Sequence, residues 1–485
     1  METTTTSQNI ISCLQRLFMV LLVINTISKF SSAQNQNDVW YFGNHSGIDF
    51  SGALPVAISN AAMNAYEGSA SECDNNGNLI FYTDGVTIWD KNDHIMPNGS
   101  GLKGGSSSTQ AALIVNIPSQ PGIYYVFTVG DQYSNGGIYY SLVDMSLNGG
   151  LGDIVAGKKN IMLLFQSTEA IAGVLKYDRS GVWVIVHELN NNNFDSYLVN
   201  SGGVSDPIVS SMGNLRDWAH IIGPMKISPN GNFIVYETTF GSSQIELFTF
   251  NQKNGILNST RNITAYFPAV EGAYGAEFSP DNHFLYISVM WNAAYLYQLD
   301  LINNALTVLD HAEGEYIWDA LQLASNGKIY LSRNNESYVG VINNPNASGT
   351  DCIYQAHGLD LQPGTFCRLG LPTIPSYAYK PIQISDALAN TVEKGALQSE
   401  GAQINILPNP IRNATLEINS LCFNQNVADK ISLVVLDLKG KIIISKSIDH
   451  YIKDYSLDIT NLQKGCYILE IFNADEKRIT KFLRE

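Results

Sequence analysis

The sequence predicts an all-β protein in which a β-propeller is followed by a small C-terminal β-sandwich of the immunoglobulin-like type. Three observations predict this fold. A turn-and-strand phrase recurs about every fifty residues, no segment of the mature chain is convincingly helical, and the pattern changes over about the last eighty residues. Short strands repeated at such an interval are typical of propeller blades, where each blade covers its faces with two neighbours.

The recurring phrase is a turn with Asn, Asp or Gly at its tip, followed by a run of aromatic and β-branched residues. The tips are spaced 45, 59, 50, 51 and 45 residues apart, and they are Gly77, Gly122, Gly181, Gly231, Asn282 and Gly327. A hairpin turn needs residues that tolerate a positive φ, and the flanking runs alternate as half-buried strands do. Six such units predict a ring of repeated sheets.

Ahead of each phrase we expect the innermost strand of a blade. These strands lie at 68–73, 110–115, 172–176, 220–227, 274–278 and 318–323. Several of them are rich in small residues, as expected where strands converge on an axis. A seventh inner strand is predicted at 366–373, with its outer strands supplied by residues 39–43 and 53–58. The sequence therefore predicts seven blades, with six as the alternative.

The two ends of the chain differ from the repeat region. Residues 1–33 are predicted to be a signal peptide, because Arg16 precedes an apolar run and small residues precede Gln34. The propeller is assigned to residues 34–380, a polar linker to 381–402 and the second domain to 403–485. No other stretch reaches the about 18–20 apolar residues of a transmembrane helix, so we expect an exported chain that does not span a membrane.

The amino-acid composition of the chain limits the kinds of molecule and metal that it is expected to bind. The formal net charge is −16 and no cluster of Lys and Arg is visible, which argues against a nucleic-acid partner. Five cysteines follow the signal segment, so they are not a complete disulfide framework. Cys352 and Cys367 lie close enough in sequence to form a disulfide bond, but the sequence does not decide whether they do. The absence of a C-x-x-C pair argues against a zinc or redox site.

One face of a propeller carries the loops that enter the innermost strands and the loops that follow the second strands. Carboxylates and aromatic side chains that converge there could hold a cation or a sugar, although they could also be ordinary polar loop tips. The candidate ligand-binding residues are Glu67, Asp84, Glu169, His187, His220, Glu271, Trp291, Asp319 and Arg333, with Asp131, Glu188 and Arg368 beside them.

We predict no catalytic residue, metal site or cofactor from motifs. His187 and Glu188 lack the second histidine of a zinc-protease helix. The segment that begins at Asp74 has the composition of a calcium loop but lacks its distal Glu, so a turn is the better interpretation and Ca²⁺ the alternative. Residues 101–109 are rich in Gly and Ser without the ending of a phosphate-binding loop, and we predict a flexible loop there.

Motifs near the C-terminus occur at 407–410, 434–441, 457–467 and 479–485. In their order and spacing they resemble the type A C-terminal sorting domain of the Bacteroidetes type IX secretion system. The residues that carry the signal are Pro408, Asn409, Pro410, Gly440, Gly465, Tyr467 and Lys481. Two features depart from the family: Cys466 lies inside its Gly-x-Tyr element, and the end has one lysine in place of two.

The resemblance implies export through the periplasm and the outer membrane by the type IX machinery. A sorting protease would then remove this domain. It would leave the propeller secreted or on the outer cell surface, released or attached to lipopolysaccharide.

The first 380 residues resemble the N-terminal propeller of secreted Bacteroidetes proteins that are associated with gliding motility and adhesion. The matching stretches are 40–50, 81–92, 96–99, 183–187 and 370–372. The repeats also resemble the WD40-like repeat of periplasmic propellers. This resemblance implies a fold, and it transfers no activity.

Two functional hypotheses follow from these observations. The first is a non-catalytic binding or adhesion module whose partners are the secretion machinery, its protease and a surface glycan or lipopolysaccharide. The second is an exported polysaccharide hydrolase or lyase that uses the acidic face. A catalytic pair would need two carboxylates about 5–9.5 Å apart in a cleft, with at least one raised pKa.

Overall fold

The structure is a computed structural model of the whole chain, which divides into two compact units, Met1–Ser385 and Asp386–Glu485. In the first unit it describes residues 36–117, 119–133, 136–241, 243–291, 293–313 and 318–376. In the second unit it describes 405–406, 415–419, 431–437, 442–448, 454–460, 462–472 and 477–484. The predicted signal peptide and linker lie outside the described residues.

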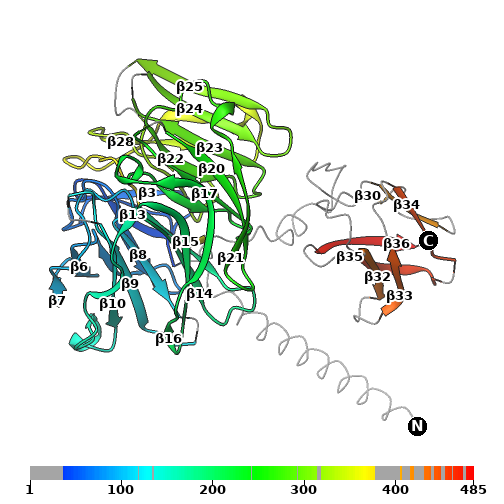
Figure 1. The fold of residues 1–485 in the computed structure, drawn as a ribbon, viewed down its shortest axis with the longest axis horizontal. Coiled ribbons are helices and arrows are strands. Elements are labelled where there is room, and N and C mark those ends of the chain that lie inside the picture. Colours follow the sequence, from blue (N-terminus) through cyan, green and yellow to red (C-terminus); the bar gives the residue numbers. More distant parts are fainter. Residues whose placement is uncertain are drawn as a thin grey trace, which may run out of the picture. The chain divides into compact units, whose positions relative to one another are not determined.

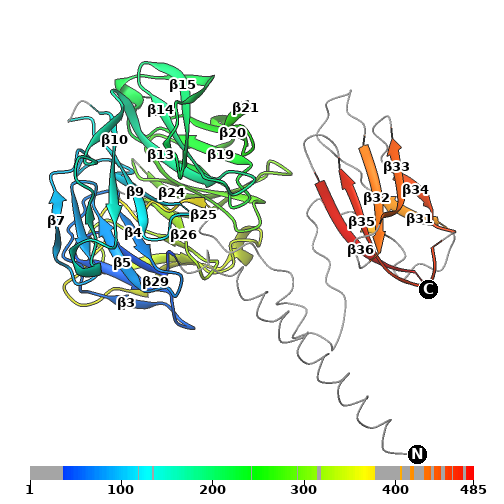
Figure 2. The ribbon, with the colours of Figure 1, turned by 90° about the horizontal axis from the view of Figure 1, so that it is seen from below.

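The first unit is all-β, and its antiparallel sheets follow one another in chain order (Figures 1 and 2). The first sheet has three strands, β1 (Val39–Phe42), β2 (Ser46–Asp49) and β3 (Val56–Ile58). The second has four: β4 (Ala70–Cys73), β5 (Leu79–Thr83), β6 (Thr87–Asp90) and β7 (Ile95–Ser100).

Two sheets of five strands come next. One contains β8 (Ala112–Asn116), β9 (Ile123–Val129), β10 (Ile138–Asp144), β11 (Asp153–Ile154) and β12 (Ile161–Leu164). The other contains β13 (Ser167–Leu175), β14 (Val182–Glu188), β15 (Asn191–Asn200), β16 (Gly203–Val204) and β17 (Ile208–Arg216).

Three sheets of four strands complete the series. They are β18 (Met225–Ile227), β19 (Phe233–Glu237), β20 (Ile245–Asn251) and β21 (Ile256–Asn262); β22 (Ala273–Phe278), β23 (Phe284–Val289), β24 (Ala293–Asp300) and β25 (Leu306–Glu313); and β26 (Leu321–Leu323), β27 (Ile329–Leu331), β28 (Tyr338–Ile342) and β29 (Tyr354–Asp360).

The predicted turn tips lie between the first and second strands of their sheets. Gly77 has a φ of 85° and Asn282 a φ of 67°, the left-handed region that the turn requires. The third turn differs from the prediction, because its positive φ of 58° falls on Arg179 and not on Gly181.

The first strands of successive sheets pack against one another, as predicted for strands around an axis. A Cβ added to Gly68 would lie 2.2 Å from the backbone nitrogen of Ala111, and one added to Gly275 would lie 2.3 Å from the backbone oxygen of Asp319. The predicted excess of small residues therefore has a physical cause: the strands approach too closely for a larger side chain.

Segment 366–373 links the first and last of these strands. Leu369 N donates to Tyr66 O (3.2 Å), Ala320 N donates to Leu369 O (3.1 Å), and Thr373 N donates to Ser69 O (2.8 Å).

The sheet β1–β3 contacts the same two neighbours. Trp40 packs against Tyr330 of β27, and Tyr41 packs against Tyr82 of β5. Counting this sheet and segment 366–373 as one blade gives seven, which stays a prediction.

Two cysteines on which the sequence left a question open are not bridged. Cys352 is buried beside Tyr286, whereas Cys367 is buried in another apolar cluster with Trp40. Both are free thiols, so the alternative of a disulfide between them is wrong.

The second unit contains two antiparallel sheets. One has β30 (Asn405–Ile406), β31 (Thr415–Asn419) and β34 (Asp454–Asp458), and the other has β33 (Ile442–Ile448), β32 (Ile431–Asp437), β35 (Gly465–Phe472) and β36 (Lys477–Arg484). Side chains of both sheets, among them Leu416, Leu457, Leu433 and Phe482, share one apolar core. This sharing is what a sandwich requires.

The residues of the predicted sorting signal are partly described. Gly465 begins β35, and buried Tyr467 donates its hydroxyl to Gln463 O (2.8 Å). Lys481 lies on β36. Pro408, Asn409, Pro410 and Gly440 lie outside the described residues. In the described part of the chain we find no helix with the length and apolar character needed to cross a bilayer.

Candidate functional site

Three of the predicted carboxylates converge where the innermost strands begin. Glu67 precedes β4, Glu169 lies at the start of β13 and Asp319 precedes β26. All three are buried, with Glu67 5% exposed and the other two 0%. Since carboxylates are almost never buried without partners, their surroundings decide what they can do.

Tyr274 of β22 joins this group across the ring. Its hydroxyl donates to Oε2 of Glu67 (2.5 Å), while Ser107 donates its hydroxyl to Oε1 of the same carboxylate (2.7 Å). The sequence prediction missed Tyr274, although it is the one large residue in the small-residue run 272–276, with which β22 begins. We call Glu67, Glu169, Asp319 and Tyr274 the axial carboxyl cluster.

Glu169 is held by the backbone of its neighbours. Its Oε2 accepts hydrogen bonds from the backbone N and the hydroxyl of Thr109, both 2.9 Å, and its Oε1 accepts one from Gln132 N at 3.0 Å. Asp319 is held less completely. Its Oδ2 accepts a bond from Asn334 N (2.9 Å), while no described residue donates to its Oδ1.

The members of the cluster perturb one another electrostatically. Burial raises the pKa of Glu67 to about 7, with a contribution from Asp131, and it raises the pKa of Glu169 to about 8, with a contribution from Glu67. Burial also raises the pKa of Asp319 well above its ordinary value, and Glu67 adds to this shift. The cluster therefore retains protons at pH values where exposed carboxyls are ionised.

Apolar side chains close the region around Tyr274. Tyr274 packs in a buried cluster with Leu189, Ile221, Ile222, Met290 and Leu369. Phe240 and Trp291 rest on this cluster with their ring centroids 4.4 Å apart. Predicted Trp291 thus packs on its neighbours, as part of the cover over the axis.

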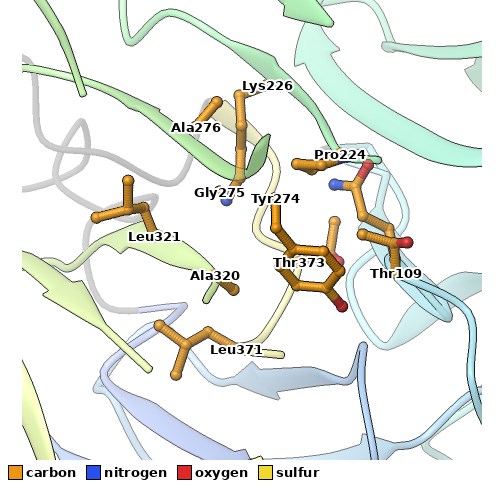
Figure 3. A pocket seen from close by; sticks show the side chains of 11 residues that line it. Thr109, Pro224, Lys226, Tyr274, Gly275, Ala276, Ala320, Leu321, Leu371 and Thr373 are labelled. Carbon is orange, nitrogen blue, oxygen red and sulfur yellow. The ribbon is translucent and has the colours of Figure 1, made fainter. Parts of the chain in front are cut away.

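The cavity on the axis is small. Side chains from several inner strands surround it, among them Lys226, Tyr274, Leu321 and Leu371 (Figure 3), and its volume is about 20 Å³. That volume suits about one water molecule and is far below the about 300–1,000 Å³ of a ligand pocket. Lys226 pairs with Glu277 (3.5 Å), and burial lowers the pKa of its ammonium group.

Two of the predicted ligand-binding residues form hydrogen bonds with backbone groups close to them in the chain. His187 is buried, with Nδ1 2.5 Å from Glu188 O and its ring 4.6 Å from that of Phe194. Burial lowers its pKa to about 3, so it stays neutral. Asp84 accepts bonds from the backbone N of Val86 (2.9 Å) and Thr87 (2.7 Å), which makes it a turn residue.

Other predicted residues lie outside the cluster. His220 is held between the carboxylate of Asp217 (2.7 Å) and Gly241 O (2.8 Å). Arg333 donates to Ala356 O (3.3 Å), and Glu271 is exposed in the loop before β22.

Two further residues named beside these are also engaged locally. Arg368 stacks on Phe366, and Glu188 accepts bonds from Asn191 and Asn193. Of the nine candidates, the structure brings Glu67, Glu169 and Asp319 together.

The segment 101–109 differs from its prediction. A Cβ on Gly104 would lie 2.3 Å from Gly85 O, and one on Gly105 would lie 2.4 Å from Asp131 N. This segment is therefore packed against its neighbours at these glycines, and the prediction of a flexible loop is wrong there. Its Ser107 and Thr109 supply hydrogen bonds to two members of the axial carboxyl cluster.

The carboxylate of Asp74, the alternative Ca²⁺ ligand, lies in the turn between β4 and β5. Oδ1 of Asp74 accepts bonds from the backbone N of Asn76 (2.8 Å) and Asn78 (3.0 Å), so this carboxylate caps its own turn. Among the described residues, no three or more His, Cys, Asp or Glu side chains are grouped so that they could hold a metal ion.

The second unit matches a known family of protein domains. Residues 405–485 match a family described as the secretion system C-terminal sorting domain. The C-terminal unit is a type IX sorting domain. This finding confirms the resemblance drawn from the sequence and means that the chain is exported to the cell surface or the extracellular space.

Several solved structures are similar to part of this chain. A candidate 6-phosphogluconolactonase from Bacteroides uniformis is 12% identical, with a TM-score of 0.45, over 69% of this chain and 98% of that one. One from Bacteroides fragilis is 10% identical, with a TM-score of 0.44, over 70% and 98%.

The WD40 repeats of RRP9 are 15% identical, with a TM-score of 0.26, over 38% and 49%. Likeness at this level transfers no activity to this chain. Among curated proteins none matches the chain.

Proposed function

We propose that the protein is a non-catalytic binding or adhesion module that acts in the extracellular space or on the outer cell surface. The observation that carries this proposal is the closed axis. The carboxylates that could have formed an active site are buried and bonded to their own chain, and the cavity beside Tyr274 has a volume of about 20 Å³.

The sorting domain supports the location and the first partners of this module. A chain that carries such a domain must engage the type IX machinery and the protease that removes the domain. The propeller unit is then released or held at the surface, where a glycan or lipopolysaccharide is the partner that we propose for it.

One observation favours the alternative, a polysaccharide hydrolase or lyase. Glu67 and Glu169 have pKa values of about 7 and 8, in the range of a general acid. Against this, a catalytic pair must reach the glycosidic bond, and a sugar ring cannot enter a cavity with room for about one water molecule. The structure therefore favours binding over catalysis.

One experiment separates the two functions. The purified chain is screened on a glycan array, and each polysaccharide that it binds is incubated with it while released oligosaccharides are measured. Binding without products is the expected result. Products that disappear in Glu67→Gln and Glu169→Gln would replace the binding module with an enzyme, and the absence of binding to any glycan would contradict the proposal.

A further inference from the structure

Exposed apolar side chains gather at the same end of the strands as the axial carboxyl cluster. Tyr133 is 78% exposed, Phe165 68%, Leu215 53% and Trp218 44%. They lie in the loop after β9, in the loop before β13, at the end of β17 and in the loop before β18. We call these four residues the rim band. Adjoining apolar side chains that stay exposed mark interaction sites.

Backbone contacts show that the loops of the rim band adjoin one another. A Cβ on Gly137 would lie 2.7 Å from Phe165 O. Leu189 N donates to Gln166 O (3.3 Å), and Asn190 N donates to Arg216 O (2.6 Å). The band thus runs across loops of two successive sheets and the connection to a third, so it is longer than a single sugar ring.

Four consecutive asparagines, residues 190–193, lie along the same line. Asn190 is exposed and has a φ of 66°, and the other three are half-buried at the start of β15. Asn191 and Asn193 donate their amides to Glu188, which is thereby occupied by its own chain. Neutral amide groups therefore lie beside the apolar side chains of the band.

The band has no exposed cation. Arg216 is the one Lys or Arg in residues 130–137, 165–166, 189–193 and 213–218, and it is 0% exposed and paired with Glu246 (2.6 Å). Asp217 beside it is paired with His220. A chain of net charge −16 with no accessible cation at this surface repels polyanions.

We infer that the rim band binds a neutral polysaccharide chain. This inference rests on the proposed binding function and names its ligand class and its site. The C–H faces of sugar rings stack on aromatic side chains, whose few rotatable bonds make the stacking inexpensive in entropy, and sugar hydroxyls bond to amides. The absence of cations excludes acidic glycans and lipopolysaccharide phosphates as the preferred ligand.

The test uses the full chain in affinity electrophoresis through gels that contain a neutral polysaccharide (xylan, β-glucan or galactomannan) or an acidic one (alginate or polygalacturonate). We expect retardation in at least one neutral gel and none in the acidic gels. Trp218→Ala and Phe165→Ala should each weaken the retarding interaction about tenfold, and Trp218→Phe, which keeps a ring, should retain most of it.

The matched control is Tyr177→Ala. Tyr177 is 69% exposed and follows β13 at the end of the strand opposite Glu169, so its replacement should leave binding unchanged. Glycan binding that survives Trp218→Ala and Phe165→Ala overturns the rim band and leaves the binding module intact. Preference for the acidic gels overturns the ligand class. A chain that binds no glycan overturns the proposed function as well.

Discussion

The axial carboxyl cluster and the rim band occupy the same end of the same strands, yet they have opposite environments. Near the axis, loops from several sheets cover one another, so Glu67, Glu169 and Asp319 lose contact with water. At the rim no segment of the described part of the first unit covers the loops, so the aromatic side chains of the band stay exposed. Burial here depends on distance from the axis more than on residue type.

A segment of three residues shows the same contrast. Arg216 is buried at 0% exposure, where it stacks on Tyr236 and pairs with Glu246, whereas Trp218 is 44% exposed. Burying a charge costs several kcal/mol unless partners compensate it, and burying an aromatic ring is favourable. Arg216 is buried together with its partners, whereas the ring of Trp218 stays at the surface, as the proposed rim band requires.

Among the substitutions that test the contrast between buried Arg216 and exposed Trp218, we expect the largest loss of stability from Arg216→Ala. The substitution leaves Glu246 buried without its partner, so the free energy of unfolding should fall by about 3–5 kcal/mol. Urea denaturation measures it. Trp218→Ala and the exposed Arg179→Ala should each change it by less than about 0.5 kcal/mol. Equal losses in Arg216→Ala and Trp218→Ala would remove the contrast between the two positions.

The second expected effect is a dependence of folding stability on pH. The folded-state pKa values of Glu67 and Glu169, about 7 and 8, lie above the 4.5 of an unperturbed glutamate, so the folded state holds protons that the unfolded state has released. Stability should therefore fall as the pH rises from about 5 to about 8. Glu72 and Glu237, whose pKa values burial also raises, act in the same direction.

Glu67→Gln tests the origin of that slope. Gln cannot ionise, so the variant should be more stable than the wild type at pH 8, by about 1–3 kcal/mol, and should lose part of the slope. Thermal unfolding midpoints at pH 5, 6, 7 and 8 measure it. Stability that rises with pH in the wild type would show that Glu67 and Glu169 are not protonated in the folded protein.

An effect of similar size and opposite sign is expected from Tyr274→Phe. The substitution removes the donor to Oε2 of Glu67, and it should lower the free energy of unfolding by about 1–3 kcal/mol. Tyr133→Phe, which removes a hydroxyl from a side chain that is 78% exposed, is the matched control and should have no measurable effect. A neutral Tyr274→Phe would mean that the cluster gains nothing from its contact across the ring.

The sequence by itself determined the local features of this protein. The turn tips and alternating runs predict the strands, because hairpin chemistry and burial of one face act within a few residues. The small residues at Gly68 and Gly275 predict inner strands in close contact, which the structure confirms. The sorting motifs predict the C-terminal domain, and the family comparison confirms it. Loop position also singled out Glu67, Glu169 and Asp319.

Only the tertiary structure decided how those carboxylates are used. The partners of Glu67 lie 40 and 207 residues away in the chain, at Ser107 and Tyr274, and no local pattern links them. The burial of a loop residue likewise depends on segments that are distant in the sequence. A loop is covered or exposed according to which other sheets reach it, so His187 is buried and Trp291 is partly buried, while Tyr133 and Trp218 remain exposed. Local sequence specifies strands and turns, and the packing of distant segments specifies which loop residues meet solvent.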